Sequence, residues 1–425
     1  MTSGDNVSDE VENIGSEIRN TKVALVGNCI GTLFALIGVG SLVFLILLST
    51  RAFGQISDLP EYYAPAKLVL DGHGASAFTL AGLGDAQHRL FPSMGSRIVP
   101  LFVPPLGLTL LSPIALIPET AIAYVWKLVL VLSLVASICL LRKSFELNYK
   151  QTCYLIAAIS LSDACYEALR IDQLAPILLL SYAATIYCLQ RNYDIPAGLW
   201  LCLIILKPQQ FLPFLAYLAG TKRVRPLIVC GIGFLLLTVV AYFQIGQNGF
   251  ANYTTLVSSP SSIQYMQPEL TPTLRGQLLK LFPSAASTIF SITSVAYFAS
   301  IAFSFCWGLR YSRHPKSLLI GVLTVMPLAL VSSLHCHNYD LLLLIPSILV
   351  IFSDVVVLFG SPIKLAVIFG GITFMLPLAI IIHYDYLLKG GQFNPWFFQL
   401  MILAISLIVL VSRNKALGAR QSERS

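Results

Sequence analysis

Long apolar runs alternate with short polar segments along most of this chain. A helix that crosses a membrane needs roughly 20 apolar residues, and most of the runs approach or exceed that length. The pattern therefore predicts an all-α, polytopic membrane protein with about 12 transmembrane helices. We place these helices at residues 23–49, 100–117, 120–141, 152–168, 174–190, 195–219, 226–245, 286–309, 317–334, 338–358, 364–383 and 396–412.

Two of the apolar runs contain residues that break helices. The run 195–219 is interrupted by Lys207 and Pro208, and the run 100–117 contains four prolines. Proline removes a backbone donor and kinks a helix. Inside a membrane, such a break is tolerated where neighbouring protein or a cavity satisfies the freed backbone groups.

The composition excludes an ordinary soluble protein. Of the 425 residues, 56% are hydrophobic and only 11% are charged, whereas soluble domains carry about 25% charged residues. So few charges cannot cover the surface of a soluble fold of this size. The net charge of +7 does not indicate nucleic-acid binding, because the basic residues stand singly or in short clusters at the ends of apolar runs, as they do beside membrane helices.

The distribution of lysine and arginine predicts the orientation, because these residues are enriched in short cytoplasmic loops. The basic tail 413–425 is placed in the cytoplasm, and counting back places the tail 1–22 there as well. Residues 23–412 then form a single transmembrane domain, whose long extracytoplasmic loops are 50–99 and 246–285. Ordered loops of this length are uncommon and are usually functional.

One basic cluster disagrees with this orientation. Arg142, Lys143 and Lys150 fall on the extracytoplasmic side when the helices are counted as above. Either the helices are wrongly divided in this region, or the rule is locally overridden. The side on which residues 163–173 lie is left open for the same reason.

Asp58 is the first residue that could carry chemistry. It follows the first apolar run directly, and a carboxylate at that depth could accept a proton from a hydroxyl group. A structural role is also possible, because Asp58 with Glu61 resembles a capping box, and Pro60 suits a first helical turn. Gly72 would then end the same short helix.

A second polar cluster stands at the outer end of an apolar run. His335, His337, Tyr339 and Asp340 lie within six residues of one another, and ionisable residues at a membrane boundary often mark a functional site. Two histidines alone do not make a metal site. The remaining alternatives are interfacial anchoring by the tyrosine and hydrogen-bond donation to a phosphate or a sugar.

Isolated cations form a third group of candidates. Lys207 interrupts an apolar run and needs a partner, which an anion in a cavity could provide. Arg275 lies in the second long loop, and Arg89 and Arg97 lie in the first. Each of these arginines could clamp a phosphate or could simply contact solvent and lipid headgroups. We expect Lys127 to extend its ammonium group to the inner membrane surface.

The remaining polar patch consists of Glu167, Arg170, Asp172 and Gln173, which form either a plain connecting loop or the rim of a cavity. The chain has no Walker loop and no dinucleotide-binding fingerprint. An enzyme of this kind would therefore receive its donor through the membrane.

The order of these pieces resembles glycosyltransferase family 87. This is a family of integral membrane proteins of GT-C type that includes polyprenol-phosphate-mannose-dependent mannosyltransferases of bacterial envelope synthesis. The resemblance extends over about residues 50–345 and rests on several short motifs. In order, they are Asp58-Leu59-Pro60-Glu61-Tyr62-Tyr63-Ala64, Leu70-Asp71-Gly72, Pro104-Pro105, Leu111-Ser112-Pro113-Ile114-Ala115-Leu116-Ile117-Pro118, Trp126, Gln173, Leu206-Lys207-Pro208-Gln209, Leu274-Arg275-Gly276 and His335-Cys336-His337-Asn338-Tyr339-Asp340.

Three positions depart from the family pattern. Asp172 stands where the family often has glycine before Gln173, Val103 replaces the tyrosine of a Tyr-Pro-Pro motif, and Leu334 replaces the proline before the histidines. These departures bear on the sugar and the acceptor more than on the class of enzyme.

The resemblance implies an inverting transferase of the cell's inner (plasma) membrane. Its donor would be a polyprenyl-phosphate sugar, with mannose the expected hexose, and its acceptor a glycolipid or polysaccharide at the extracytoplasmic face. Asp58 aligns with the catalytic acidic position, and no cofactor or metal ion is expected. The candidates for binding the donor phosphate or sugar are Lys207, Arg275, His335, His337, Gln173 and Arg89.

Two other classes of protein are compatible with the sequence. A transporter or flippase of lipid-linked or small solutes would place its charges near the bilayer midplane, and only Lys207 fits that description well. A scaffold for envelope assembly would have no use for Asp58.

Overall fold

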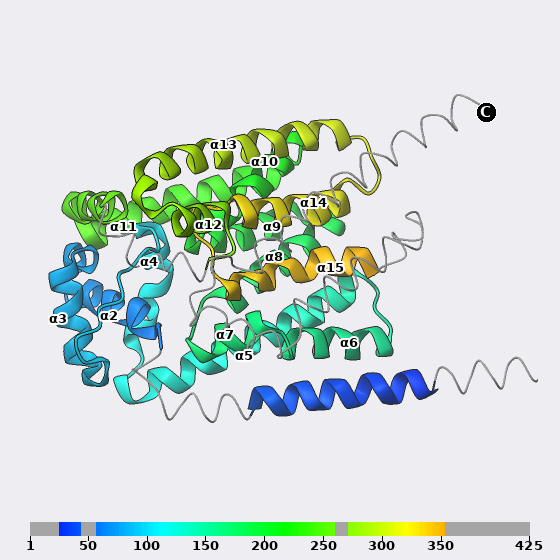
Figure 1. The fold of residues 1–425 in the computed structure, drawn as a ribbon, viewed down its shortest axis with the longest axis horizontal. Helices are drawn as coiled ribbons and strands as arrows, with labels where there is room; N and C mark the ends of the chain where they lie inside the picture. Colours follow the sequence, from blue (N-terminus) through cyan, green and yellow to red (C-terminus); the bar gives the residue numbers. More distant parts are fainter. Residues whose placement is uncertain (1–24, 44–56, 260–270, 353–425) are drawn as a thin grey trace, which may run out of the picture.

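The computed structural model describes residues 25–43, 57–259 and 271–352, and within these ranges the fold is helical without strands (Figure 1). The all-α prediction is therefore confirmed for this part of the chain. The predicted tails 1–22 and 413–425 and the predicted helices 364–383 and 396–412 lie outside the described residues.

After the helix Leu25–Val43, α-helices and short 3₁₀ helices alternate along the chain. The α-helices are α2 (Leu59–Leu70), α3 (Leu80–Leu90), α4 (Pro105–Leu111), α5 (Glu119–Ser144), α6 (Tyr149–Ser160), α7 (Asp163–Arg170), α8 (Ala175–Gln190), α9 (Asp194–Leu201), α10 (Leu212–Gly220), α11 (Val224–Ser258), α12 (Leu274–Leu281), α13 (Ala286–Tyr311), α14 (Ser317–Ser332) and α15 (Ile345–Phe352). The 3₁₀ helices are η1 (Gly74–Phe78), η2 (Pro92–Met94), η3 (Ser112–Leu116), η4 (Cys202–Leu206), η5 (Pro208–Gln210), η8 (Pro283–Ala285) and η9 (Asn338–Leu344).

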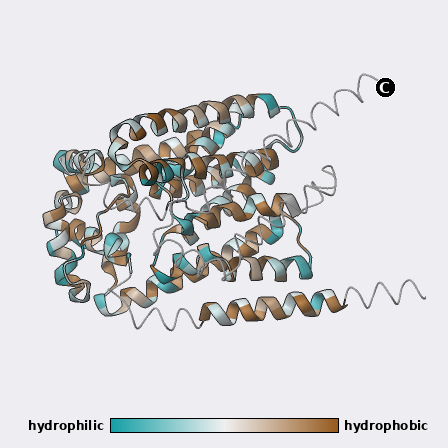
Figure 2. Ribbon diagram, viewed as in Figure 1, coloured by the Kyte–Doolittle hydropathy of each residue, from teal (hydrophilic) through white to brown (hydrophobic). Residues whose placement is uncertain are grey.

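Four helices are long and apolar enough to cross a membrane by length and composition. They are Leu25–Val43, Glu119–Ser144, Val224–Ser258 and Pro283–Tyr311, and Figure 2 shows hydrophobic residues along most of their length. Shorter apolar helices accompany them. The expected total of about 12 transmembrane helices is thus not confirmed, although a membrane protein is supported.

The predicted helix 100–117 is not a single membrane span in the structure. Its prolines divide it into α4 and η3, which pack against α2. The hydroxyl of Tyr63 donates to the carbonyl of Ile117 at 2.7 Å, so the start of α5 lies close to α2. Because the chain turns back here instead of crossing, α5 begins at the same end of the molecule as Asp58.

The predicted helix 195–219 is also wrong as a single span, since the chain runs out and back within it. The α9 helix starts beside α11, where Gly198 lies against Pro226, and η4 ends beside Gly107 of α4. After the break at Lys207 and Pro208, α10 returns, and the hydroxyl of Tyr217 donates to the carbonyl of Ser317.

These two corrections leave the total number of passes along the bundle up to α10 unchanged. They also explain why the cluster of Arg142, Lys143 and Lys150 disagreed with the predicted orientation. One crossing is removed before α5 and one is added between α9 and α10, so the loops after α5, α10 and α13 all lie at the end opposite α2 and α3 (Figure 1). The guanidinium of Arg223 indeed donates to the carbonyl of Leu189 at the end of α8. All three clusters share this end: Arg142, Lys143 and Lys150; Lys222, Arg223 and Arg225; Arg310, Arg313 and Lys316.

The long helix α11 is bent where it leaves the apolar bundle. Gly246 adopts a non-helical conformation with φ 63° and ψ −178°, which glycine reaches without the steric cost of a side chain. Beyond the bend, the amide of Asn252 donates to the carbonyl of Ala75 at 3.0 Å. The rings of Tyr253 and Phe78 meet edge to face at 5.4 Å. The last turns of α11 therefore cover η1.

Candidate active site

Asp58 stands at the start of α2. Pro60 occupies the first turn, where its missing N–H costs nothing, and Gly72 follows the helix with φ 78°, as predicted for a C-terminal glycine. The predicted capping box is wrong, because the Asp58 side chain makes no capping hydrogen bond. Instead, the hydroxyl oxygen of Ser57 accepts from the N–H of Leu59 at 3.0 Å. The Asp58 carboxylate is thereby left for other contacts.

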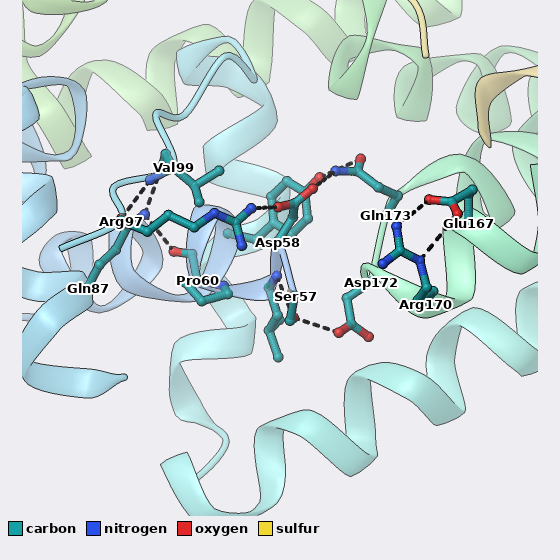
Figure 3. Close-up of polar contacts among 12 residues, drawn as sticks. Ser57, Asp58, Pro60, Gln87, Arg97, Val99, Glu167, Arg170, Asp172 and Gln173 are labelled. Carbon is teal, nitrogen blue, oxygen red and sulfur yellow. Dashed lines mark hydrogen bonds and ion pairs between the residues drawn. The ribbon is translucent and has the colours of Figure 1, made fainter. Parts of the chain in front are cut away.

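Both carboxylate oxygens of Asp58 have partners from other segments (Figure 3). Arg97 donates to Oδ1 at 2.6 Å, and Gln173 donates through its amide nitrogen to Oδ2 at 2.7 Å. The side chain of Asp58 is 14% exposed. Burial raises the pKa of Asp58, and Arg97 and Gln173 counteract part of that rise. A carboxylate with a raised pKa is suited to general-base work.

The loop between α7 and α8 is fixed in place beside Asp58. The ammonium of Lys127 pairs with one oxygen of Asp172 at 2.8 Å, and the hydroxyl of Ser57 donates to the other at 2.6 Å. The indole N–H of Trp126 donates to the Asp172 carbonyl at 2.9 Å. The backbone N–H of Asp58 donates to the carbonyl of Ile171. Residues 163–173, whose side was open, therefore lie at the Asp58 end.

Lys127 does not extend to a membrane surface, so that expectation is wrong. Its side chain is 5% exposed, and besides pairing with Asp172 its ammonium donates to the carbonyl of Leu169. A buried ammonium is costly without an opposite charge, and the carboxylate of Asp172 supplies that charge here.

A second group of polar residues surrounds Lys207. This residue occupies the break between η4 and η5, where its backbone is not helical (φ −147°, ψ 69°), and its ammonium pairs with Asp340 at 2.8 Å. It also lies 4.5 Å from the centroid of the Tyr339 ring. The expected partner of Lys207 was an anion in a cavity, and the structure provides a carboxylate of the chain itself. The backbone N–H of His337 donates to the second oxygen of Asp340 at 3.0 Å.

The two histidines stand together beside Lys207, with ring centroids 4.6 Å apart. Burial and the charge of Lys207 lower the pKa of His335 to about 4. Burial and the neighbouring His335 lower the pKa of His337 well below its usual value. Both imidazoles are therefore neutral near pH 7 and can each donate one N–H. Among the described residues, His335 Nδ1 has no hydrogen-bond partner.

Glu61 connects the two groups. Its carboxyl accepts from the backbone of Phe102, whose ring lies 6.2 Å from that of His335. Burial raises the pKa of Glu61 to about 8, with Asp58 adding to the rise and Lys207 opposing it. Since both charges act on the same carboxyl group, Asp58 and Lys207 belong to one electrostatic neighbourhood.

Two of the expected binding residues are not bonded to either group, although the positive charge of Arg275 contributes to the lowered pKa of His335. The guanidinium of Arg275 donates to the hydroxyl oxygens of Thr293 and Ser294 at 2.9 Å and so joins α12 to α13. Arg89 is exposed on α3. Among the described residues, neither arginine forms a hydrogen bond or an ion pair with Asp58 or Lys207.

Comparison with known proteins identifies the family. The sequence profile of glycosyltransferase family 87 matches residues 102–333, more than half of the chain. This chain belongs to glycosyltransferase family 87. No curated protein and no solved structure matches it. Family 87 membership makes the chain a glycosyltransferase, and its match includes Gln173 and Lys207 but ends before His335 and begins after Asp58.

The sequence did not indicate several of the contacts in this candidate site. Arg97 could not be told from Arg89 by position, because only folding brings it to Asp58. Tyr62, which lies within the first motif, donates through its hydroxyl to the Gln173 amide oxygen at 2.9 Å. No sequence pattern indicates that Lys127 pairs with Asp172, because the two residues lie in different helical regions and meet only in the folded chain.

Proposed function

We propose that the protein transfers a hexose from a polyprenyl-phosphate sugar to a hydroxyl group of a glycolipid or polysaccharide, with inversion at the anomeric carbon. Mannose is the sugar favoured by the family resemblance. The observation that carries the proposal is the position of a membrane-boundary carboxylate, Asp58, in one electrostatic neighbourhood with a buried ammonium and two neutral imidazoles.

The orientation follows from the three basic clusters, which share the end opposite Asp58. By the positive-inside rule, that end faces the cytoplasm. Asp58 and the histidines then face the extracytoplasmic side of the inner membrane, both termini are cytoplasmic, and 23–412 forms one transmembrane domain of GT-C type. A polyprenyl chain would lie in the bilayer with its phosphate at the level of these residues.

Asp58 acts in this proposal as the general base. Its carboxylate takes the proton of the acceptor hydroxyl while the hydroxyl oxygen attacks the anomeric carbon. The bond between that carbon and the phosphate oxygen breaks, and its electron pair leaves with the polyprenyl phosphate. General-base catalysis of this kind contributes about 10²- to 10⁴-fold to the rate.

The residues around Lys207 stabilise the departing phosphate. Its ammonium supplies positive charge in a buried setting, where electrostatic stabilisation is strongest, and Asp340 keeps that charge in place before the donor binds. His335 and His337 supply neutral N–H donors. No step of this scheme requires a metal ion or a cofactor.

The test uses the full chain in nanodiscs with a panel of radiolabelled polyprenyl-phosphate sugars and a lipid extract. We expect label to move to a new product with the native protein and not with Asp58→Asn, while both unfold alike. Transfer by Asp58→Asn at the native rate would contradict the role of the base. Translocation of donors without any transfer would favour a flippase.

A further inference from the structure

Gln173 connects the proposed base to a buried tyrosine. Its amide nitrogen donates to Asp58 Oδ2 at 2.7 Å, and its amide oxygen accepts from the hydroxyl of Tyr62 at 2.9 Å. The sequence had suggested that Gln173 binds the donor. We propose instead that Gln173 is a positioning residue, which orients the Asp58 carboxylate for proton transfer; this inference rests on the proposed function of Asp58.

The amide of Gln173 has only one orientation that satisfies its neighbours. An ionised carboxylate can only accept a hydrogen bond, whereas a phenolic hydroxyl can also donate one. The amide oxygen must therefore face Tyr62, and the NH₂ group must face Asp58. Gln173 is 3% exposed and Tyr62 is 1% exposed. With both ends engaged and almost no accessible surface, Gln173 is poorly placed to bind a sugar and well placed to hold Asp58.

The backbone that carries Gln173 is held from three directions. Asp172 adopts a left-handed conformation with φ 67°, which is uncommon for a residue with a side chain. The ammonium of Lys127, the hydroxyl of Ser57 and the indole of Trp126 all bond to Asp172. These contacts, of which Figure 3 shows the one from Ser57, offset the backbone cost and fix the distance between Gln173 and Asp58.

The charges around Asp58 determine what a substitution at Gln173 would do. Arg97 faces the other carboxylate oxygen, Asp172 acts on Asp58 through its charge, and Tyr62 reaches it through Gln173. Glu61, whose pKa of about 8 leaves it mostly protonated at pH 7, is the other carboxyl group nearby. Replacing the amide NH₂ by a carboxyl oxygen removes a donor to the ionised form of Asp58 and adds a like charge. Both changes disfavour ionisation of Asp58.

The experiment compares Gln173→Glu with the native chain in nanodiscs by two readouts. Infrared difference titration without substrate follows the Asp58 carboxyl band, which is identified by its loss in Asp58→Asn. Transfer kinetics are measured over the same pH range. We expect the apparent pKa of Asp58 to rise by about one unit or more. We also expect kcat at neutral pH to fall about tenfold and to recover at higher pH, with the donor KM nearly unchanged.

Two further variants support the comparison. Tyr62→Phe keeps the ring beside Trp126 but frees the amide to rotate, so we expect a smaller shift in the same direction, and this variant decides the question if Gln173→Glu does not fold. Gln151→Glu is the matched control. Gln151 caps α6 at the other end of the molecule, where glutamate serves equally well, so its titration and kinetics should equal those of the native chain.

An unchanged Asp58 titration in both Gln173→Glu and Tyr62→Phe would overturn the inference. So would a large rise of the donor KM with an unchanged pH profile, since that result would make Gln173 a donor-binding residue. The titration needs no substrate. A native protein that transfers no sugar would therefore contradict the proposed function, while the infrared shift would still decide whether Gln173 positions Asp58.

Discussion

The buried pair of Lys127 and Asp172 gives the sharpest prediction about stability. Replacing Lys127 by methionine keeps most of the side-chain volume and removes the ammonium. The carboxylate of Asp172 then stays in a buried position, with the Ser57 hydroxyl as its remaining side-chain donor. We expect the variant to be strongly destabilised.

The magnitude follows from burial. The two side chains are 5% and 2% exposed, so solvent screening is small. Removing one partner of a buried ion pair costs about 3–5 kcal/mol, because the other charge is left uncompensated. The hydrogen bond from Ser57 persists in the variant, which places the expected loss near the lower limit of that range, at about 3 kcal/mol.

A second variant separates the loss of charge from the loss of packing. Combining Lys127→Met with Asp172→Gly removes both charges, and glycine adopts the left-handed conformation at this position without strain. We expect the double variant to regain at least half of the lost free energy of unfolding. The measurement is unfolding in mixed micelles with increasing denaturing detergent, followed by tryptophan fluorescence. A single variant within about 1 kcal/mol of the native chain, or a double variant no more stable than the single one, would refute the reasoning.

Three other predictions concern pH, helix packing and the leaving group. Because the pKa of Glu61 is about 8 in the folded chain against 4.5 ordinarily, the free energy of unfolding should fall as pH rises between these values, by about 5 kcal/mol from this group, and Glu61→Gln should remove that part of the pH dependence. A Cβ on Gly308 would lie 2.4 Å from the carbonyl oxygen of Tyr217, whereas one on Gly231 would meet nothing within 4 Å. Gly308→Ala should therefore cost about 1–3 kcal/mol, and Gly231→Ala should stabilise the chain by about 0.5–1 kcal/mol. His335→Ala should lower kcat about 10²-fold through the loss of a donor to the departing phosphate.

The same unfolding measurement, repeated across pH, checks Glu61 and the two glycines. A flat pH profile for the native chain would contradict the burial of Glu61, and equal effects of the two alanine substitutions would contradict the close contact at Gly308. For His335, the assay is sugar transfer in nanodiscs. A variant with native kcat would show that the imidazole does not act on the phosphate.

The helical class and the main polar clusters could be predicted from the sequence, because hydropathy and charge are local properties. The number of crossings could not. The prolines of 100–117 and the Lys207–Pro208 break were visible, yet whether a broken helix crosses the membrane or turns back depends on its neighbours. The carbonyl of Ile117 bonds to Tyr63, and that contact exists only in the folded chain.

The candidate site shows the same division between local and tertiary information. Asp58, Lys207 and the histidines stand out as polar residues at the ends of apolar runs. Their partners do not, since Arg97 and Gln173 reach Asp58 from 39 and 115 residues away. Asp172 stands where the family often has glycine, and its backbone is left-handed, a conformation that glycine adopts freely. In this chain, contacts of the Asp172 side chain with Lys127 and Ser57 hold that conformation instead.

The bend of α11 at Gly246 bears on how this enzyme could be divided or recombined. The segment before the bend, Val224–Ile245, is about 33 Å long at about 1.5 Å per residue, enough for a bilayer core of about 30 Å. The segment after it packs on η1, and the contact between Asn252 and Ala75 joins residues 177 positions apart. A chimera that takes the region around η1 from a relative but keeps its own α11 would therefore replace only one side of the interface between them. The two segments form one packing unit, and designs that exchange one of them should transplant the other with it.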